Sequence, residues 1–245
     1  MRGKSVRAPV SPGVGLHQIE LSRLQYKQGI SMMDIKIRAA RSDDADFLSW
    51  LILTAGRAHV KKGIWEVILG MPEEQCLYFL KLLSVTKIPH FFHHSCYLLA
   101  DVEGSPVAGL GGYDPAISGN PALWKALPEV FKEVKGSSPG AYMNGSPPRI
   151  LNCIPESVKS AWVIDSVAAV HEFRRKGIVS KLLKEILLKG RQQGFKSAQI
   201  NIYIGNVAAQ RLYEKHGFKI LDEIRDPYFE TQIGSPGMSR MLLDL

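Results

Sequence analysis

The sequence contains few cysteines and no long apolar run. Cys76, Cys96 and Cys153 are the only cysteines among 245 residues, and none of them forms a CxxC pair. An odd number of widely spaced cysteines argues against a disulfide framework and against a zinc knuckle, and it fits a reducing compartment. No apolar run approaches the roughly 20 residues needed to cross a bilayer, so we expect a soluble protein without a membrane partner.

Familiar ligand motifs are absent as well. The chain has neither a GxxxxGK[ST] loop nor a GxGxxG fingerprint, which argues against a P-loop NTPase and a standard dinucleotide fold. His93, His94 and Cys96 lie together in FFHHSC. Adjacent histidines on a strand point to opposite faces, and no fourth ligand follows at a familiar spacing, so we expect no metal site.

The positive charge is unevenly distributed along the chain. The formal net charge is +8, and residues 1–33 hold five cations against one acid, a net +4. We predict that 1–33 is a basic, disordered tail, with two interpretations open: an untargeted extension of a cytoplasmic protein, or a plastid or mitochondrial transit peptide. The remaining cations form no stripe with interleaved aromatics, so we expect no nucleic-acid partner, although a basic nucleic-acid-associated protein stays a competing hypothesis.

The folded domain is predicted to span 34–245. IKIRAA indicates a strand, and a helix is expected from Ser42 onward. A second helix should begin at Pro72, and CYLLADVEGSPVAGLGGY indicates two strands around an EGSP turn. We interpret about 114–159 as an insertion, because its pattern weakens and GSSPGAYMNGSPP is rich in turn residues. Strands and helices then alternate from AWVIDSVAAV to MSRMLLDL.

The stretch EFRRKGIVSKLLKEILLKG places three cations and a glycine directly before a helical pattern. A helix N-terminus has unpaired N–H groups and a partial positive charge, so it attracts anions such as phosphate. Gly177 lets ligand oxygens approach the backbone, while Arg174, Arg175 and Lys176 add full charges. This pattern predicts a pyrophosphate site.

The same stretch resembles the GCN5-related N-acetyltransferase (GNAT) family. Arg174, Gly177 and Val179 match its central motif, although Val179 is bulkier than the Gly or Ala of the family. NVAAQRLYEKHGF resembles the second family signature, and together the two matches cover most of 160–220. The resemblance implies an α/β (α+β) acyltransferase fold, with a mixed, mostly antiparallel sheet that is splayed between strands four and five and flanked by helices.

The resemblance also assigns cofactor contacts. The splayed strand would bind pantetheine through its backbone at Ala168, Ala169 and Val170. The pyrophosphate would lie on the backbone of the segment comprising Lys176, Gly177, Ile178, Val179, Ser180 and Lys181. Asn206 would contact the cofactor arm, and it would also cap a helix.

Two residues are candidates for proton transfer. Tyr213 matches the tyrosine that protonates the leaving thiolate, and the alternative is a core tyrosine on an amphipathic helix. Some members carry a glutamate five residues before the asparagine, but this chain has Asn201 there. The resemblance offers Asp165 instead as the candidate base, because it lies on the strand leading to the cradle, where other members carry an acid. A backbone-satisfied aspartate at the end of a strand is the equal alternative.

The implied activity is acetyl transfer from acetyl-CoA to a primary amine by direct attack in a ternary complex, without a metal. A catalytically inactive acyl-CoA-binding module is the alternative, because of Val179 and Asn201. The acceptor could be a peptide N-terminus, a lysine or a small amine. We expect the walls of the acceptor-binding site to be formed by residues 54–72, 114–159 and 227–237.

Overall fold

The computed structural model describes residues 34–134 and 148–245, and its folded unit spans Ile35–Leu245. The predicted tail 1–33 and nearly all of GSSPGAYMNGSPP lie outside the described residues. Among the described residues, no helix is long and apolar enough to cross a membrane.

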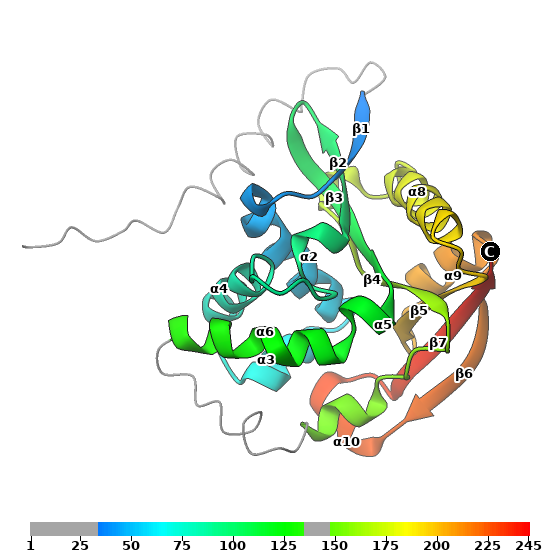
Figure 1. Cartoon of the computed structure of the whole chain (residues 1–245). Coiled ribbons are helices and arrows are strands. Elements are labelled where there is room, and N and C mark those ends of the chain that lie inside the picture. Colours follow the sequence, from blue (N-terminus) through cyan, green and yellow to red (C-terminus); the bar gives the residue numbers. More distant parts are fainter. Residues whose placement is uncertain (1–33, 135–147) are drawn as a thin grey trace, which may run out of the picture. The chain divides into compact units, whose positions relative to one another are not determined.

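A seven-stranded sheet forms the centre of this unit, in the order β1-β2-β3-β4-β5-β7-β6 (Figure 1). Of its neighbouring strands, only β4 and β5 run parallel, and the other pairs are antiparallel. The mixed, mostly antiparallel sheet predicted from the sequence is therefore confirmed. The strands are β1 (Ile35–Ala39), β2 (Tyr97–Val102), β3 (Ser105–Tyr113), β4 (Ala161–Ala169), β5 (Ser197–Tyr203), β6 (Lys219–Arg225) and β7 (Gly237–Asp244).

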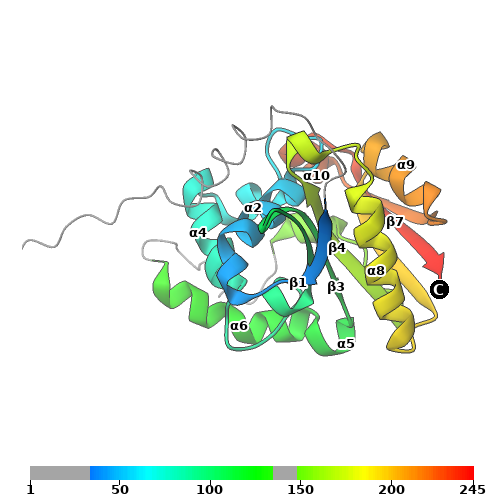
Figure 2. The same ribbon diagram turned by 90° about the horizontal axis from the view of Figure 1, so that it is seen from above.

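Helices cover both faces of the sheet. Figure 2 shows α2 and α4 on one side of it and α8 on the other. The helices are α2 (Ala45–Arg57), α3 (Ile64–Leu69), α4 (Glu73–Leu83), α5 (Pro115–Ser118), α6 (Asn120–Glu133), α8 (Ile178–Gln192), α9 (Val207–Lys215) and α10 (Pro227–Ile233). Short 3-10 turns add η1 (Ser42–Asp44), η2 (His94–Cys96), η3 (Arg149–Cys153) and η4 (His171–Phe173).

A large apolar cluster lies between the sheet and the helices α2, α4 and α6. In α2 the side chains of Leu48, Leu51 and Ile52 recur at helical spacing and are fully buried. The α6 helix joins this cluster through Leu127 and Val130. Part of the 114–159 segment is therefore integral to the core.

The first predicted helix and hairpin differ from the sequence-based boundaries by a few residues. Ser42 begins the 3-10 turn η1, and the α-helix starts at Ala45. In the hairpin, Glu103 and Gly104 both have positive φ (52° and 81°), and β3 already begins at Ser105. Two central residues with positive φ are typical of a type I′ turn, whose twist matches that of the strands it joins.

Two buried histidines lie in the loop between α4 and β2. His90 Nδ1 accepts a hydrogen bond from Phe92 N–H at 3.1 Å, and His93 Nδ1 accepts one from Ser95 N–H at 3.3 Å. Protonation would turn each acceptor nitrogen into a donor that faces another donor. Burial lowers the pKa of both imidazoles from 6.5 to about 4.

We therefore expect the free energy of unfolding to fall as the pH decreases from 6.5 to about 5. In this window the unfolded chain binds protons that the folded chain excludes, so each histidine removes about 1.5 kcal/mol. Urea unfolding at the two pH values measures this loss. The variant His93→Asn keeps a capping acceptor but does not titrate. Its free energy of unfolding should therefore fall by less than that of the parent between the two pH values, and the difference is the contribution of one histidine. Equal pH dependence in the two proteins would contradict the prediction.

Candidate active site

The strands β4 and β5 separate midway along their length. Their parallel pairing covers Ala161–Ile164 on β4 and Ser197–Ile200 on β5, and within the described sheet it stops there. The following residues, Asp165–Ala169 and Asn201–Tyr203, diverge and leave unpaired strand edges facing each other. This divergence is the splay that was expected between the fourth and fifth strands.

A β-bulge in β4 lies at the start of the divergence. Gly111 pairs with Asp165, whereas Gly109 pairs with Ala168, so β4 carries one residue more than β3 in this interval. Ser166, inside the bulge, has a φ of 51°, which is unusual for a residue with a side chain. A bulge bends its strand and changes the direction of the neighbouring side chains, and here it turns β4 away from β5.

Beyond the bulge, the backbone of β4 alternates between β3 and the opening. Val170 N–H donates to Val107 C=O of β3 at 2.8 Å. Alternate residues of an antiparallel strand face the same neighbour, so Ala168 also faces β3, and Ala169 faces the opening. The carbonyl of Ala169 accepts a hydrogen bond from Arg174 Nε at 3.1 Å, which leaves its N–H as the donor toward a ligand. Of the three predicted pantetheine contacts, the geometry favours Ala169.

The N-terminus of α8 forms the cradle that the sequence predicts. Arg175 and Gly177 both have left-handed backbone conformations, with φ of 61° and 76°, and Gly177 is the N-cap. Lys181 N–H donates to Gly177 C=O at 3.1 Å, so the preceding N–H groups, from Ile178 to Ser180, have no carbonyl one turn earlier. These groups can receive an anion.

Side chains around the cradle divide into exposed cations and anchoring residues. Ile178 is buried and contributes only its backbone, whereas Val179 and Ser180 are partly buried. Ser180 Oγ lies 3.0 Å from His216 Nε2, which ties the first turn of α8 to the end of α9. The exposed cations are Arg174, Arg175, Lys176 and Lys181.

Asn206 and Tyr213 are positioned by α9, on the β5 side of the opening. Asn206 is the N-cap, and its Oδ1 accepts a hydrogen bond from Ala209 N–H at 3.3 Å. Because the cap uses the oxygen, the amide NH₂ group is the part that can donate to a ligand. Tyr213 is buried against Phe218, and burial together with the charge of Asp165 raises the pKa of its phenol. The phenol therefore stays protonated at neutral pH.

Asp165 lies at the point where β4 leaves β5, and its side chain is partly buried. Its Oδ1 accepts a hydrogen bond from Ser166 N–H at 2.5 Å. Burial raises the pKa of this carboxyl, and the bonds from Ser166 offset part of the rise. A carboxylate with a raised pKa is better matched to accepting a proton near neutral pH than an ordinary one.

The charge of Asp165 acts on four tyrosines, and the sequence analysis identified only one of them as a site residue. Burial, together with the charge of Asp165, raises the pKa of each phenol. The four come from β2, β3, β5 and α9, so their convergence depends on strand register and could not be read from local sequence. They are Tyr97, Tyr113, Tyr203 and Tyr213.

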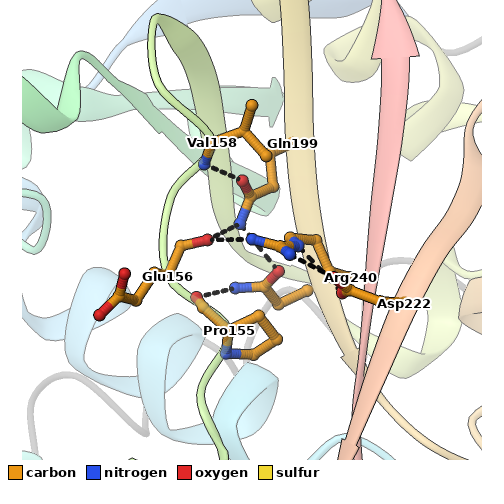
Figure 3. A network of polar contacts seen from close by, with 7 residues as sticks. Pro155, Glu156, Val158, Gln199, Asp222 and Arg240 are labelled. Atoms are coloured by element: carbon orange, nitrogen blue, oxygen red, sulfur yellow. Dashed lines mark hydrogen bonds and ion pairs between the residues drawn. The ribbon is translucent and has the colours of Figure 1, made fainter.

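Asn201, at the glutamate position of some family members, belongs to a network of structural hydrogen bonds. Figure 3 shows this network around Gln199, with Pro155, Glu156 and Val158 of the segment before β4. Its Oδ1 accepts from Gln199 Nε2 at 3.1 Å, and its Nδ2 donates to Pro155 C=O at 3.4 Å. Gln199 is fully buried, accepts from Val158 N–H at 2.7 Å and donates to Glu156 C=O at 3.1 Å. This network anchors the segment before β4 to β5, and both ends of the Asn201 amide are used in it.

The three segments that we expect to form the walls of the acceptor-binding site meet on the face of β5 that carries Tyr203. Tyr203 donates to Gly56 C=O at 2.6 Å and accepts from Ile64 N–H at 3.2 Å, which fixes the start of α3. An apolar cluster around it includes residues of α3, η3 and α10, among them Ile150 and Phe229. Parts of 54–72, 114–159 and 227–237 therefore lie side by side.

The cysteines and the histidine-rich loop supply no obvious reactive group. Cys153 is buried, its Sγ donates to Ile224 C=O at 3.2 Å, and burial raises the pKa of its thiol. Within residues 34–134 and 148–245, no three His, Cys, Asp or Glu side chains are grouped in a way that could hold a metal ion.

Comparison with known proteins agrees with this geometry. The model of the Acetyltransferase (GNAT) family matches residues 69–218, and none of the curated proteins matches. One solved acetyltransferase is 20% identical, with a TM-score of 0.57, over 85% of this chain and 98% of its own. An N-acetyltransferase from Staphylococcus aureus Mu50 is 19% identical, with a TM-score of 0.60, over 85% and 100%.

At these identities the two structures show the fold alone, but the family match spans more than half of the chain. The family resemblance noted from the sequence is confirmed. The chain belongs to the Acetyltransferase (GNAT) family.

Proposed function

We propose that this protein transfers an acetyl group from acetyl-CoA to a primary amine by direct attack in a ternary complex. One observation carries the proposal: the opening between β4 and β5 begins at Asp165, and β4 then leads directly into the α8 cradle. Unpaired strand edges, a carboxylate and an anion site are thus assembled in one place. Each of these features has a use in thioester aminolysis.

The cradle fits coenzyme A in charge and in backbone geometry. The diphosphate is matched by the N-terminus of α8 and by the exposed cations around Gly177. The N–H of Ala169 and the amide of Asn206 are donors suited to the pantetheine arm. When bound, acetyl-CoA supplies the activated acetyl group as a thioester.

Asp165 and Tyr213 each carry out one proton transfer of the reaction. A primary amine has a pKa near 10 and enters as an ammonium ion, so Asp165 accepts its proton, directly or through one water. The amine nitrogen then forms a bond to the acetyl carbon, and the carbon–sulfur bond breaks. Tyr213 gives its proton to the departing sulfur, and the second proton lost by the nitrogen returns to the Tyr213 phenolate through water. The products are the amide and the free thiol of coenzyme A, and Asp165 releases its proton to solvent.

No covalent acetyl-enzyme is needed for this reaction. Cys153 lies near the acceptor walls, but its thiol is buried and hydrogen-bonded, and the pKa of the thiol is raised. The thiolate, which is the nucleophilic form, is therefore disfavoured. Direct attack by the acceptor amine is the simpler route.

The second candidate is a module that binds acyl-CoA without turnover, and the observation that favours it is the structural use of Asn201. Incubating the full chain with acetyl-CoA and a panel of peptides, lysine derivatives and small amines distinguishes the two. We expect amine-dependent release of thiol, together with a product that is heavier by one acetyl group. Saturable binding of acetyl-CoA without product from any amine would support the module instead.

A further inference from the structure

Tyr97, Gly111 and Asp165 form a row across three neighbouring strands. Tyr97 of β2 pairs with Gly111 of β3, and Gly111 pairs with Asp165 of β4. Residues directly opposite each other in a sheet project from the same face, so the phenol and the carboxylate share a face with only a glycine between them.

The missing side chain at Gly111 is what lets the phenol extend toward Asp165. A Cβ added to Gly111 would lie 3.3 Å from Cε1 and Cζ of Tyr97 and 3.3 Å from the carbonyl oxygen of Asp165. The outer part of the ring, next to its hydroxyl, therefore lies over Gly111. Any larger residue there would push the ring away.

The hydroxyl of Tyr97 is buried and makes no hydrogen bond with the described residues. The whole residue is only 1% exposed. Buried polar groups are rarely left unpaired, so this hydroxyl needs an explanation, and a role in the reaction is one that fits its place beside Asp165. Burial and the nearby Asp165 charge hold the pKa of this phenol well above its usual value, so it remains a donor, with Ser166 as its other polar neighbour.

We propose that Tyr97 is a positioning residue: its hydroxyl, unbonded in this structure, closes onto the ionised Asp165 carboxylate in the reacting complex and holds it toward the acceptor amine. This inference rests on the proposed function, because it assigns to Asp165 the acceptance of the proton. The other titratable groups around Asp165 are Tyr113, Tyr203 and Tyr213.

The test is the variant Tyr97→Phe, which keeps the ring and removes the donor. Selective ¹³C labelling of aspartate carboxyls lets NMR follow the titration of Asp165 in the full chain, with and without bound acetyl-CoA. We expect the substitution to raise the pKa of Asp165, and to shift the acidic limb of kcat/KM to higher pH with roughly a tenfold loss of kcat. An unchanged Asp165 titration would overturn the proposal.

Two further variants make the result specific. Gly111→Ala keeps the hydroxyl but displaces the ring, and it should shift the titration in the same direction. Tyr113→Phe removes a phenol from the same face of β3, two residues beyond Gly111, and should leave the titration nearly unchanged. An equal shift in Tyr97→Phe and Tyr113→Phe would overturn the assignment. A shifted titration without turnover of any amine would leave Tyr97 as the positioning residue and refute the proposed function instead.

Discussion

Replacing Gly177 by glutamate is expected to weaken binding of acetyl-CoA at least 100-fold. The residue has a φ of 76°, and a side chain in this conformation costs roughly 1–2 kcal/mol. The new carboxylate would also stand at the N-cap of α8, where we place the diphosphate, and like charges there cost several kcal/mol. Because 1.4 kcal/mol corresponds to a factor of ten, the charge repulsion alone accounts for two orders of magnitude in affinity, whereas the backbone cost lowers the stability of the free protein. Calorimetric titration with acetyl-CoA measures the change.

Gly194 provides a matched control near the opposite end of the same helix. It also has a positive φ, 89°, and at both glycines the position that a Cβ would occupy has no heavy atom within 4 Å. It lies just beyond the C-terminal end of α8, about 22 Å from the cradle, given the 15 residues of the helix. Gly194→Glu should therefore carry the same backbone cost and the same added charge without loss of binding. Equal affinity losses in both variants would place the cofactor elsewhere.

The order of strands and helices could be predicted where hydrophobic periodicity is strong and turns have distinct residues. The hairpin, the strand before the cradle and the glycine-capped helix α8 all follow from such local patterns. Their arrangement in a splayed sheet came from the family resemblance, since no local pattern specifies where two strands stop pairing.

Two of the helices that the sequence analysis did not locate, α3 and α10, are short. The α3 helix has six residues and α10 has seven, too few for an apolar period to be evident. Signals were nevertheless present. Asp226 caps α10 through Tyr228 N–H at 2.7 Å, with Pro227 as the first helical residue, and Glu66 reaches back to Gly63 N–H at 2.7 Å. An Asp-Pro pair and an acid three residues after a glycine could have located both starts.

Most of the surroundings of Asp165 could not be predicted, with Tyr213 as the exception. Its neighbours Tyr97 and Tyr203 are far away in sequence, and their placement depends on the register of β2, β3 and β5. The role of Asn201 was hidden for the same reason, because its partner Pro155 belongs to the segment before β4. Sequence patterns indicate which elements form, whereas the chemistry of this opening depends on how distant elements align.

Replacing Asp165 by asparagine should lower kcat/KM by a factor of about 10² to 10⁴, the usual contribution of a general base. Affinity for acetyl-CoA should be unchanged, because the cradle is formed by other residues. The acidic limb of the pH profile should also disappear. In the parent protein, activity falls as the pH decreases through the raised pKa of Asp165, since protonation removes the base. Steady-state kinetics across the pH range measures both effects.

Stability provides the control for this variant. Because burial raises the pKa of Asp165, the folded state favours the protonated carboxyl, and ionisation at neutral pH opposes folding. The asparagine amide oxygen can still accept the hydrogen bond from Ser166 N–H without carrying a charge. We therefore expect the Asp165→Asn variant to unfold at the same or a higher urea concentration than the parent at pH 7. Lower activity together with higher stability would show that the Asp165 carboxylate serves the reaction although it destabilises the fold. Nearly full activity would instead assign the base to another group.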